Sequence, residues 1–259
     1  MHYVTTTLVD HVATVQFDQP KKLNALSEPM IEEIIEALED CRARKARVVI
    51  LRARPGVKVW SAGHDVSELP RGKRDPLGWD DPLRQVIRAI EELPIPVIAL
   101  IEGGVWGGAC ELALVCDVTL STTESTFAVT PAKLGVPYNA TGLITFKTVV
   151  PMPALKELIF TAAPISAKRA HELGIVNHVR DKDEIEAYAA NMAQQIAQNA
   201  PLSIAVAKEQ LRILASASSM TPRMFERIQG LRRVVYDSAD YQEGLTAFDE
   251  KRKPVFTGE

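Results

Sequence analysis

Apolar residues recur along the chain in two patterns, one typical of strands and one typical of helices. Short runs rich in β-branched residues predict strands at residues 3–8, 12–17, 46–53, 96–103, 118–122 and 174–179. Apolar residues three and four positions apart predict helices at residues 27–41, 83–93, 154–162, 166–173, 183–199, 202–216, 222–236 and 239–250. The run at 46–53 is apolar at every position except Arg47 and Arg52, which predicts a strand covered on both faces.

Strands and helices alternate between residues 46 and 120. This order implies parallel pairing with right-handed crossovers, and it places ligand sites at the C-terminal ends of the strands. Two glycine-containing turns, SAGHD at 61–65 and WGGAC at 106–110, follow strands at such ends. Residues 70–82 read as a surface loop and residues 126–142 as an irregular segment.

Beyond Pro201 the pattern predicts helices only. We therefore expect a core at residues 1–200 that carries the site, and a helical C-terminal region at residues 201–259 that serves docking or oligomerisation.

Composition narrows the possible functions. A hydrophobic content of 46% over 259 residues indicates a globular chain with a sizeable core, and the net charge of −3 argues against a nucleic-acid surface. The three cysteines form no CxxC pair, so neither a zinc site nor a disulfide framework is expected. The sequence shows neither an export leader nor an apolar run of about 18 residues, which predicts a cytoplasmic protein without a membrane span.

The stretch GGVWGGACELALVCD at 103–117 carries the first indication of chemistry. It reads as a tight glycine turn that runs into a buried helix, and such a turn directs free backbone N–H groups at the helix N-terminus. The site suits an anion or a developing oxyanion. Alternatively, Gly107 and Gly108 only allow close packing of helix and sheet.

The pair of glycine turns resembles the paired oxyanion loops of the crotonase (enoyl-CoA hydratase/isomerase) superfamily. Residues 62–65 fit its A-G-x-D motif, and residues 103–111 fit its glycine-rich second loop ending in a glutamate. NALS at 24–27 and LGVP at 134–137 are further landmarks. The resemblance implies an α/β fold, a spiral of ββα units with a C-terminal helical trimerisation region, assembled as a homotrimer or a dimer of trimers.

Within the superfamily the chain is most similar to decarboxylases that act on methylmalonyl-CoA. The similarity is carried by residues 61–70, 81–85, 105–109, 134–139, 226–230 and 235–244. It implies an acyl-CoA thioester as substrate, and no metal, biotin or other prosthetic group, since coenzyme A arrives as part of the substrate.

The resemblance assigns the oxyanion hole to the backbone amides of His64 and Gly108. The His64 side chain either takes part or points away. Hydratases of the family generally use two glutamates, of which Glu111 is present, whereas Pro131 stands at the second position. Because hydration needs a group to activate water and another to deliver a proton, hydration is disfavoured. Loss of CO₂ needs no base.

Tyr138 and Thr130 flank the missing glutamate and are candidates for contact with the substrate carboxylate or the α-carbon. Glu111 either participates directly or supports a neighbouring polar group. The backbone of Asp65, Val66 and Ser67 is a candidate for contact with the adenine of coenzyme A. The same segment ends at Glu68, a further candidate for binding substrate.

The phosphates of coenzyme A call for basic partners. Lys251 is the favoured one because of its place in the C-terminal tail, and the others are Lys21, Lys22, Arg71, Lys73, Arg74 and Lys253. We expect a decarboxylase that converts methylmalonyl-CoA or malonyl-CoA into propionyl-CoA or acetyl-CoA. Two alternatives remain open: a hydratase or isomerase that uses Glu111, and a non-catalytic module that binds CoA thioesters.

Overall fold

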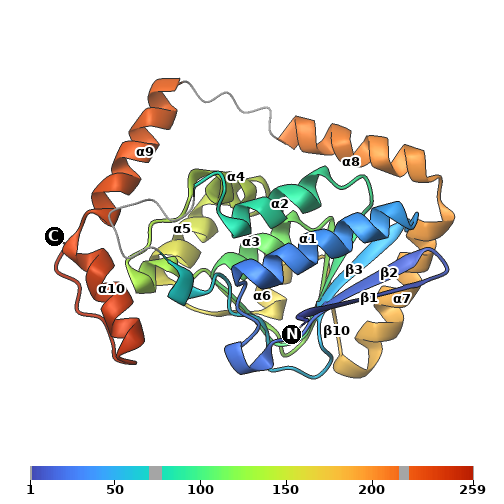
Figure 1. The fold of residues 1–259 in the computed structure, drawn as a ribbon, viewed down its shortest axis with the longest axis horizontal. Helices are drawn as coiled ribbons and strands as arrows, with labels where there is room; N and C mark the ends of the chain where they lie inside the picture. Colours follow the sequence, from blue (N-terminus) through green and yellow to red (C-terminus); the bar gives the residue numbers. More distant parts are fainter. Residues whose placement is uncertain (1, 70–77, 216–221, 259) are drawn as a thin grey trace.

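A computed structural model describes residues 2–69, 78–215 and 222–258 of the chain. These residues include a six-stranded sheet in the order β1-β2-β3-β5-β7-β10 (Figure 1). Its strands are β1 (Val4–Val9), β2 (Val12–Phe17), β3 (Val48–Ala53), β5 (Val97–Ile101), β7 (Val118–Thr122) and β10 (His178–Arg180). β1 and β2 form the expected antiparallel hairpin, and β2, β3, β5, β7 and β10 pair in parallel.

Helices cover both faces of this sheet, and strand β3 shows the arrangement. Val49 and Leu51 pack toward the cluster formed with α1 (Glu28–Ala43), α2 (Pro82–Glu92) and α3 (Gly108–Val115). Val48 and Ile50 pack on the opposite face against α7 (Lys182–Gln198). Alternate residues of one strand thus enter two different cores, as the largely apolar run at 46–53 predicted.

A second, smaller sheet was not anticipated. Its strands, in spatial order, are β4 (Val59–Ser61), β6 (Gly104–Trp106), β8 (Thr126–Ala128) and β9 (Ile165–Ser166). Units of two strands and a helix now become apparent, such as β3-β4-α2 and β5-β6-α3, in which the first strand joins the large sheet and the second joins the small one. The glycine turn therefore does not follow β5 directly, because β6 lies between them.

Two further predictions need correction. The segment at 126–142 is less irregular than expected, because it holds β8, the short helix η3 (Pro131–Leu134) and the start of α4 (Ala140–Val149). The strand predicted at 174–179 is displaced to β10. Gly174, with φ of +82°, ends α6 (Ala167–Glu172) and starts the connection to β10. The remaining helix before the C-terminal region, α5 (Met152–Thr161), lies close to its prediction.

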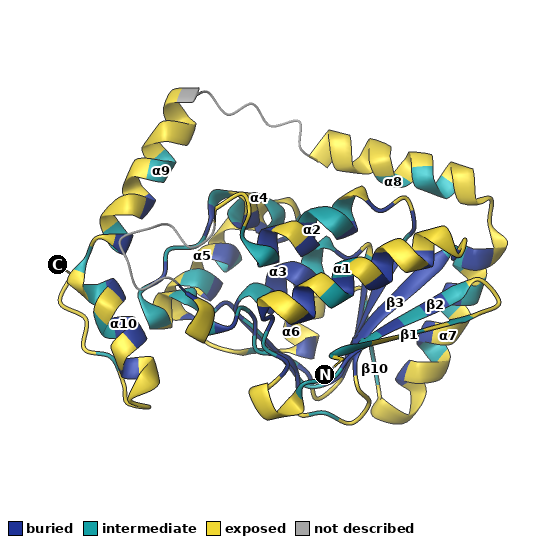
Figure 2. Ribbon diagram, in the orientation of Figure 1, coloured by how far each residue is buried: buried dark blue, intermediate teal, exposed yellow. Residues whose placement is uncertain are grey.

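The C-terminal region is helical, as predicted: α8 (Pro201–Ala215), α9 (Pro222–Tyr236) and α10 (Ala239–Asp249). Residues of α8 and α9 are mostly exposed, whereas α10 buries Tyr241 and Leu245 against Leu69 and Val136 (Figure 2). Among the described residues, no helix combines the length and the apolar character needed to cross a membrane.

Candidate active site

The site begins where β4 and β6 end. These strands pair in parallel, so their C-terminal ends lie side by side, and each leads into a glycine turn. After β4, Leu26 pairs with the chain around His64: the Leu26 amide donates to the Gly63 carbonyl at 2.8 Å, and the Asp65 amide donates to the Leu26 carbonyl at 3.4 Å. In such a parallel bridge the amide of the central residue points away from the partner. The His64 N–H is therefore directed away from Leu26.

The second turn holds the Gly108 amide next to it. Gly107 has φ of +56° and donates its N–H to the Ala128 carbonyl at 2.9 Å, which leaves Gly108 as the first residue of α3. A Cβ atom on Gly108 would lie 3.6 Å from the His64 nitrogen, and one on Gly63 would lie 2.7 Å from the Gly108 nitrogen. The two amides are neighbours, and only glycine permits this approach.

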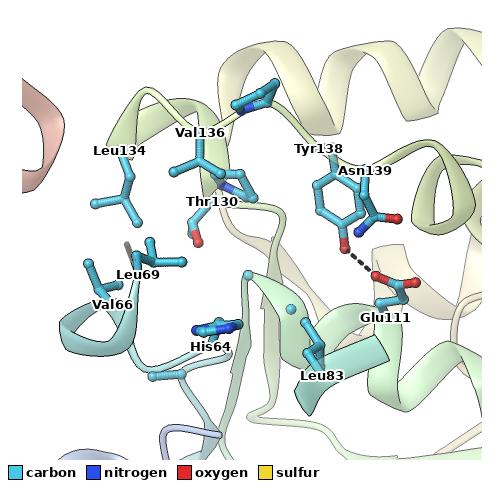
Figure 3. Close-up of a pocket in the computed structure, with 15 residues that line it drawn as sticks. His64, Val66, Leu69, Leu83, Glu111, Thr130, Leu134, Val136, Tyr138 and Asn139 are labelled. Atoms are coloured by element: carbon cyan, nitrogen blue, oxygen red, sulfur yellow. Dashed lines mark hydrogen bonds between the residues drawn. The ribbon is translucent and has the colours of Figure 1, made fainter. Parts of the chain in front are cut away.

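A small cavity of about 70 Å³ opens beside these amides. This is far below the roughly 300–1,000 Å³ of pockets for drug-sized ligands, so the cavity suits a short acyl group. Its wall is largely apolar, and Figure 3 shows Val66, Leu69 and Leu134 grouped on one side while Tyr138 and Glu111 face each other on the other. Of the residues expected from sequence, the cavity is lined by His64, Val66, Gly108, Glu111, Thr130 and Tyr138.

Glu111 projects from the first turn of α3 and is fully buried. Arg84 of α2 forms an ion pair with it, and the Tyr138 hydroxyl donates to Glu111 Oε2 at 3.4 Å. Desolvation raises the pKa of Glu111, although Arg84 opposes the shift and Asn139 contributes a further hydrogen bond. Burial, together with the charge of Glu111, also raises the pKa of Tyr138, so this hydroxyl keeps its proton and can donate it.

The His64 side chain does not point away from the site. Its Nδ1 lies 3.1 Å from the Asp65 carbonyl oxygen, and its Nε2 lies 3.1 Å from Asp81 Oδ2. Desolvation works against a charged imidazole here, but the hydrogen bond to Asp81 and the charge of that carboxylate raise the pKa of His64 above its ordinary value. Asp81 is the N-cap of α2 and also accepts the Leu83 amide.

Other residues expected from sequence lie outside the cavity lining. The Asp65 carboxylate accepts from the Ser67 amide and hydroxyl and pairs with Lys22 at 2.9 Å. Glu68 accepts the Glu28 amide. These contacts shape the loop and the short helix η2 (Val66–Glu68) behind the cavity.

The basic candidates are scattered. The exposed ones within the described residues are Lys21, Lys22, Lys251 and Lys253, and none of the four lines the cavity. Arg71, Lys73 and Arg74 lie outside the described residues.

Sequence reasoning missed Asp81, Arg84 and Asn139. Asp81 carried a usable signal, because an aspartate before a proline is a common start of a helix. This signal would have ended the predicted loop before Asp81 and started the helix at Pro82. Arg84 interrupts the buried side of α2 between Leu83 and Ile87, and a cation at such a position calls for a buried partner. Asn139 is the N-cap of α4, a helix that was not predicted.

Comparison of the chain with known proteins identifies its family. The family model described as enoyl-CoA hydratase/isomerase matches residues 8–259. The chain belongs to this family. The crotonase-like fold expected from the glycine motifs is thereby confirmed.

Among members of the enoyl-CoA hydratase/isomerase family, methylmalonyl-CoA decarboxylase of Escherichia coli (strain K12) is 50% identical over 256 residues, covering 99% of this chain and 98% of that protein. A solved structure of methylmalonyl-CoA decarboxylase in complex with 2-nitronate-propionyl-CoA matches with a TM-score of 0.98 at 50% identity, covering 100% of this chain and 99% of the other. An enoyl-CoA isomerase/hydratase of Mycosarcoma maydis is 31% identical, covering 93% of this chain and 90% of that protein.

Proposed function

We propose that this protein decarboxylates methylmalonyl-CoA or malonyl-CoA, giving propionyl-CoA or acetyl-CoA and CO₂ through a thioester enolate. The observation that carries the proposal is the combination of two adjacent backbone amides with a small, largely apolar cavity that Pro131 lines. The resemblance to the family expects the second glutamate of hydratases at this position. The 50% identity to methylmalonyl-CoA decarboxylase over nearly the whole chain supports the same activity.

The amides of His64 and Gly108 would receive the thioester oxygen. Because they are fixed by the fold before the reaction, they stabilise the negative charge of the enolate without reorganisation, and each such donor contributes about 3 kcal/mol in comparable sites. An apolar wall favours neutral CO₂ over the carboxylate from which it forms, since the carboxylate loses hydration there. These two effects act on the same step, cleavage of the C–C bond.

Tyr138 and Thr130 are the polar groups placed to orient the departing carboxylate. Both line the cavity, and Tyr138 keeps its proton. Tyr138 can therefore donate to the carboxylate and later direct protonation of the enolate carbon. In the substrate-free site this hydroxyl donates to Glu111, and donation to the substrate carboxylate would replace that hydrogen bond.

The state of Glu111 disfavours the hydratase alternative. A hydratase would need this carboxylate to activate water, yet it is fully buried and engaged by Arg84, Tyr138 and Asn139. The intact pair of amides in turn disfavours a module that binds thioesters without chemistry.

The rest of the proposal concerns substrate binding and assembly. Coenzyme A would lie along residues 65–68, with Lys251 as the favoured partner of a phosphate, and no other cofactor would be required. Residues 1–200 would form the catalytic core, and residues 201–259 would form homotrimers or dimers of trimers through the exposed apolar side chains of α8 and α9. The three buried free thiols support a reducing, cytoplasmic location.

Two substrates separate the candidate functions. The protein is incubated with methylmalonyl-CoA and, separately, with crotonyl-CoA, and the products are followed by mass. Propionyl-CoA from the first substrate supports the proposal. Hydroxybutyryl-CoA from the second without loss of CO₂ from the first would establish the hydratase instead, and binding of both without any product would leave the non-catalytic module.

A further inference from the structure

The His64 imidazole lies between two oxygen atoms that cannot donate. Nδ1 faces the Asp65 carbonyl and Nε2 faces the Asp81 carboxylate, each at 3.1 Å. A neutral imidazole carries only one N–H, so it could satisfy one of these oxygens while its second nitrogen directs a lone pair at the other. Both contacts are hydrogen bonds only when both ring nitrogens carry protons.

The Asp81 carboxylate accepts hydrogen bonds at the start of α2. Its Oδ1 accepts the amides of Leu83 and Arg84 at 2.9 and 3.4 Å, at the N-terminus of α2, where the helix dipole favours negative charge. Its side chain is 5% exposed and that of His64 is 14% exposed, so water competes weakly for either partner. The proton therefore belongs on the ring.

We propose that His64 works as an imidazolium that joins the Asp65 carbonyl to the Asp81 carboxylate, and that Asp81 is thereby a positioning residue for the His64 backbone amide. The loop bearing this amide is fixed on one side by Leu26 through main-chain bonds. The imidazolium fixes it on the other side, to α2. The same helix places Leu83 against Gly108, so α2 governs the positions of both amides.

The charged and titratable groups around His64 come from every neighbouring element. They are Asp65 and Glu68 beside η2, Lys22 on Asp65, Asp81 and Arg84 of α2, Glu111 of α3, and Tyr138. Arg84 is paired with Glu111, and burial raises the pKa of Tyr138 well above that of a histidine. Loss of the His64 proton is therefore the event expected to limit activity as the pH rises from neutral.

Asp81→Asn provides the deciding variant. Asparagine is as good an N-cap as aspartate, and its amide can donate to Nε2 of a neutral imidazole whose Nδ1–H still reaches the Asp65 carbonyl. The variant should fold and keep the loop in place without a charged ring. Asp80→Asn is the matched control, because it removes the same charge from the neighbouring exposed residue.

The first readout is the titration of His64, followed by ¹⁵N NMR of sedimented, histidine-labelled protein and assigned with His64→Gln. In the wild type and in Asp80→Asn, His64 should titrate above the ordinary histidine pKa of about 6.5. In Asp81→Asn the titration should fall to that value or below. A wild-type His64 that titrates at or below the ordinary value, or a titration unchanged in Asp81→Asn, would overturn the proposal.

The second readout is the pH profile of kcat/KM for methylmalonyl-CoA, and it rests on the proposed decarboxylation. In the wild type, kcat/KM should fall as the pH rises through the His64 titration, and in Asp81→Asn this loss should be absent. Below the pH of the wild-type His64 titration, kcat/KM of Asp81→Ala should be about 10-fold lower than that of the wild type, as expected for removal of a charged hydrogen bond. A wild-type alkaline loss that persists in Asp81→Asn would refute the positioning role. Should no variant decarboxylate, the proposed function fails and the NMR titration alone decides on the imidazolium.

Discussion

Arg84 and Glu111 form an ion pair inside the protein, with side chains that are 8% and 0% exposed. Burying two charges costs several kcal/mol each, and their attraction offsets this only while both are present. The pair therefore contributes less to stability than to the position of Tyr138. Glu111 accepts the Tyr138 hydroxyl, and the ion pair with Arg84 favours the charged form of Glu111. At the scale of single residues, the Glu111 carboxylate is a fixed part of the cavity wall.

Removing one partner should reveal this cost. Arg84→Met leaves a buried, uncompensated carboxylate and should lower the free energy of unfolding by about 3–5 kcal/mol. Adding Glu111→Gln should restore most of the loss, since the remaining side chain is then neutral. Urea unfolding of the two single variants and the double variant measures the coupling, and additive effects of the two changes would contradict a direct ion pair.

Tyr138→Phe tests the role of the hydroxyl at the same scale. The ring packs edge-on against Phe146 with centroids 5.6 Å apart, and this contact survives the change. We expect an unchanged melting temperature and a fall in kcat of about 10- to 100-fold, the loss of one hydrogen bond to a charged group. Steady-state kinetics with methylmalonyl-CoA checks this, and full turnover would remove Tyr138 from the mechanism.

At the scale of elements, the site depends on the small sheet. β4 and β6 each contribute only three residues, yet their parallel pairing brings the two glycine turns together. A hydrogen bond joins the small sheet to the large one: the buried Trp60 of β4 donates its indole N–H to the Leu100 carbonyl of β5 at 2.9 Å. The spacing of the two amides is thus set by strand register.

A methyl group between the turns should therefore abolish activity. Gly63 has φ of +87°, and its Cβ would lie 2.5 Å from the Trp106 carbonyl oxygen and 2.7 Å from the Gly108 nitrogen. Gly63→Ala should lower kcat by about 10²–10³-fold or more, the effect of losing one oxyanion donor. Gly56→Ala is the control, because Gly56 has φ of +77° and, within the described part of the chain, only its own atoms and those of its two chain neighbours lie within 4 Å of its Cβ position. It should carry the backbone strain without the kinetic loss, and equal kinetic effects would contradict the assignment.

The predictability of these elements follows from their length and partners. β3 and β5 are apolar runs whose alternate residues enter the cores on both faces of the large sheet, so the sequence pattern alone located them. β4, β6 and β8 are too short to show a period, and α4 contains Gly142 and several β-branched residues that weaken its helical signal. His64 and Gly108 were found through their glycine motifs. Asp81 and Arg84 were not, because only the packing of α2 in the folded chain brings Asp81 to His64 and Arg84 to Glu111.

At the scale of the whole molecule, α8 and α9 expose large apolar side chains to solvent. The most exposed are Leu202, Leu214 and Val234, at 81%, 70% and 69%. Apolar surface of this extent on a single chain is typical of an interface between subunits. In Figure 1 both helices stand beside the sheets and helices of the core, as an oligomerisation region would.

Disrupting one apolar face of α9 should change the assembly. Leu231 and Val234 are three residues apart, so they share a face, and both are exposed. Leu231→Asp with Val234→Asp should reduce the molar mass measured by light scattering from that of a trimer or hexamer. Arg233→Asp changes the net charge by the same −2 on the opposite side of the helix and should leave the mass unchanged. A monomeric wild type would refute the assembly itself.

The oxyanion hole proposed above uses backbone amides, and this separates two tasks in the chain. The amides belong to turns set by the pairing of β4 with β6, whereas Thr130 and Tyr138, which we propose to contact the substrate carboxylate, line the cavity from the segment 130–139. Side chains in that segment can change without disturbing the amides. The proposed site therefore suggests a route to redesign. A carboxylate introduced at Pro131 would add a second acid beside the two amides without changing the turns that carry them, so the choice of reaction could be altered separately from the groups proposed to stabilise its intermediate.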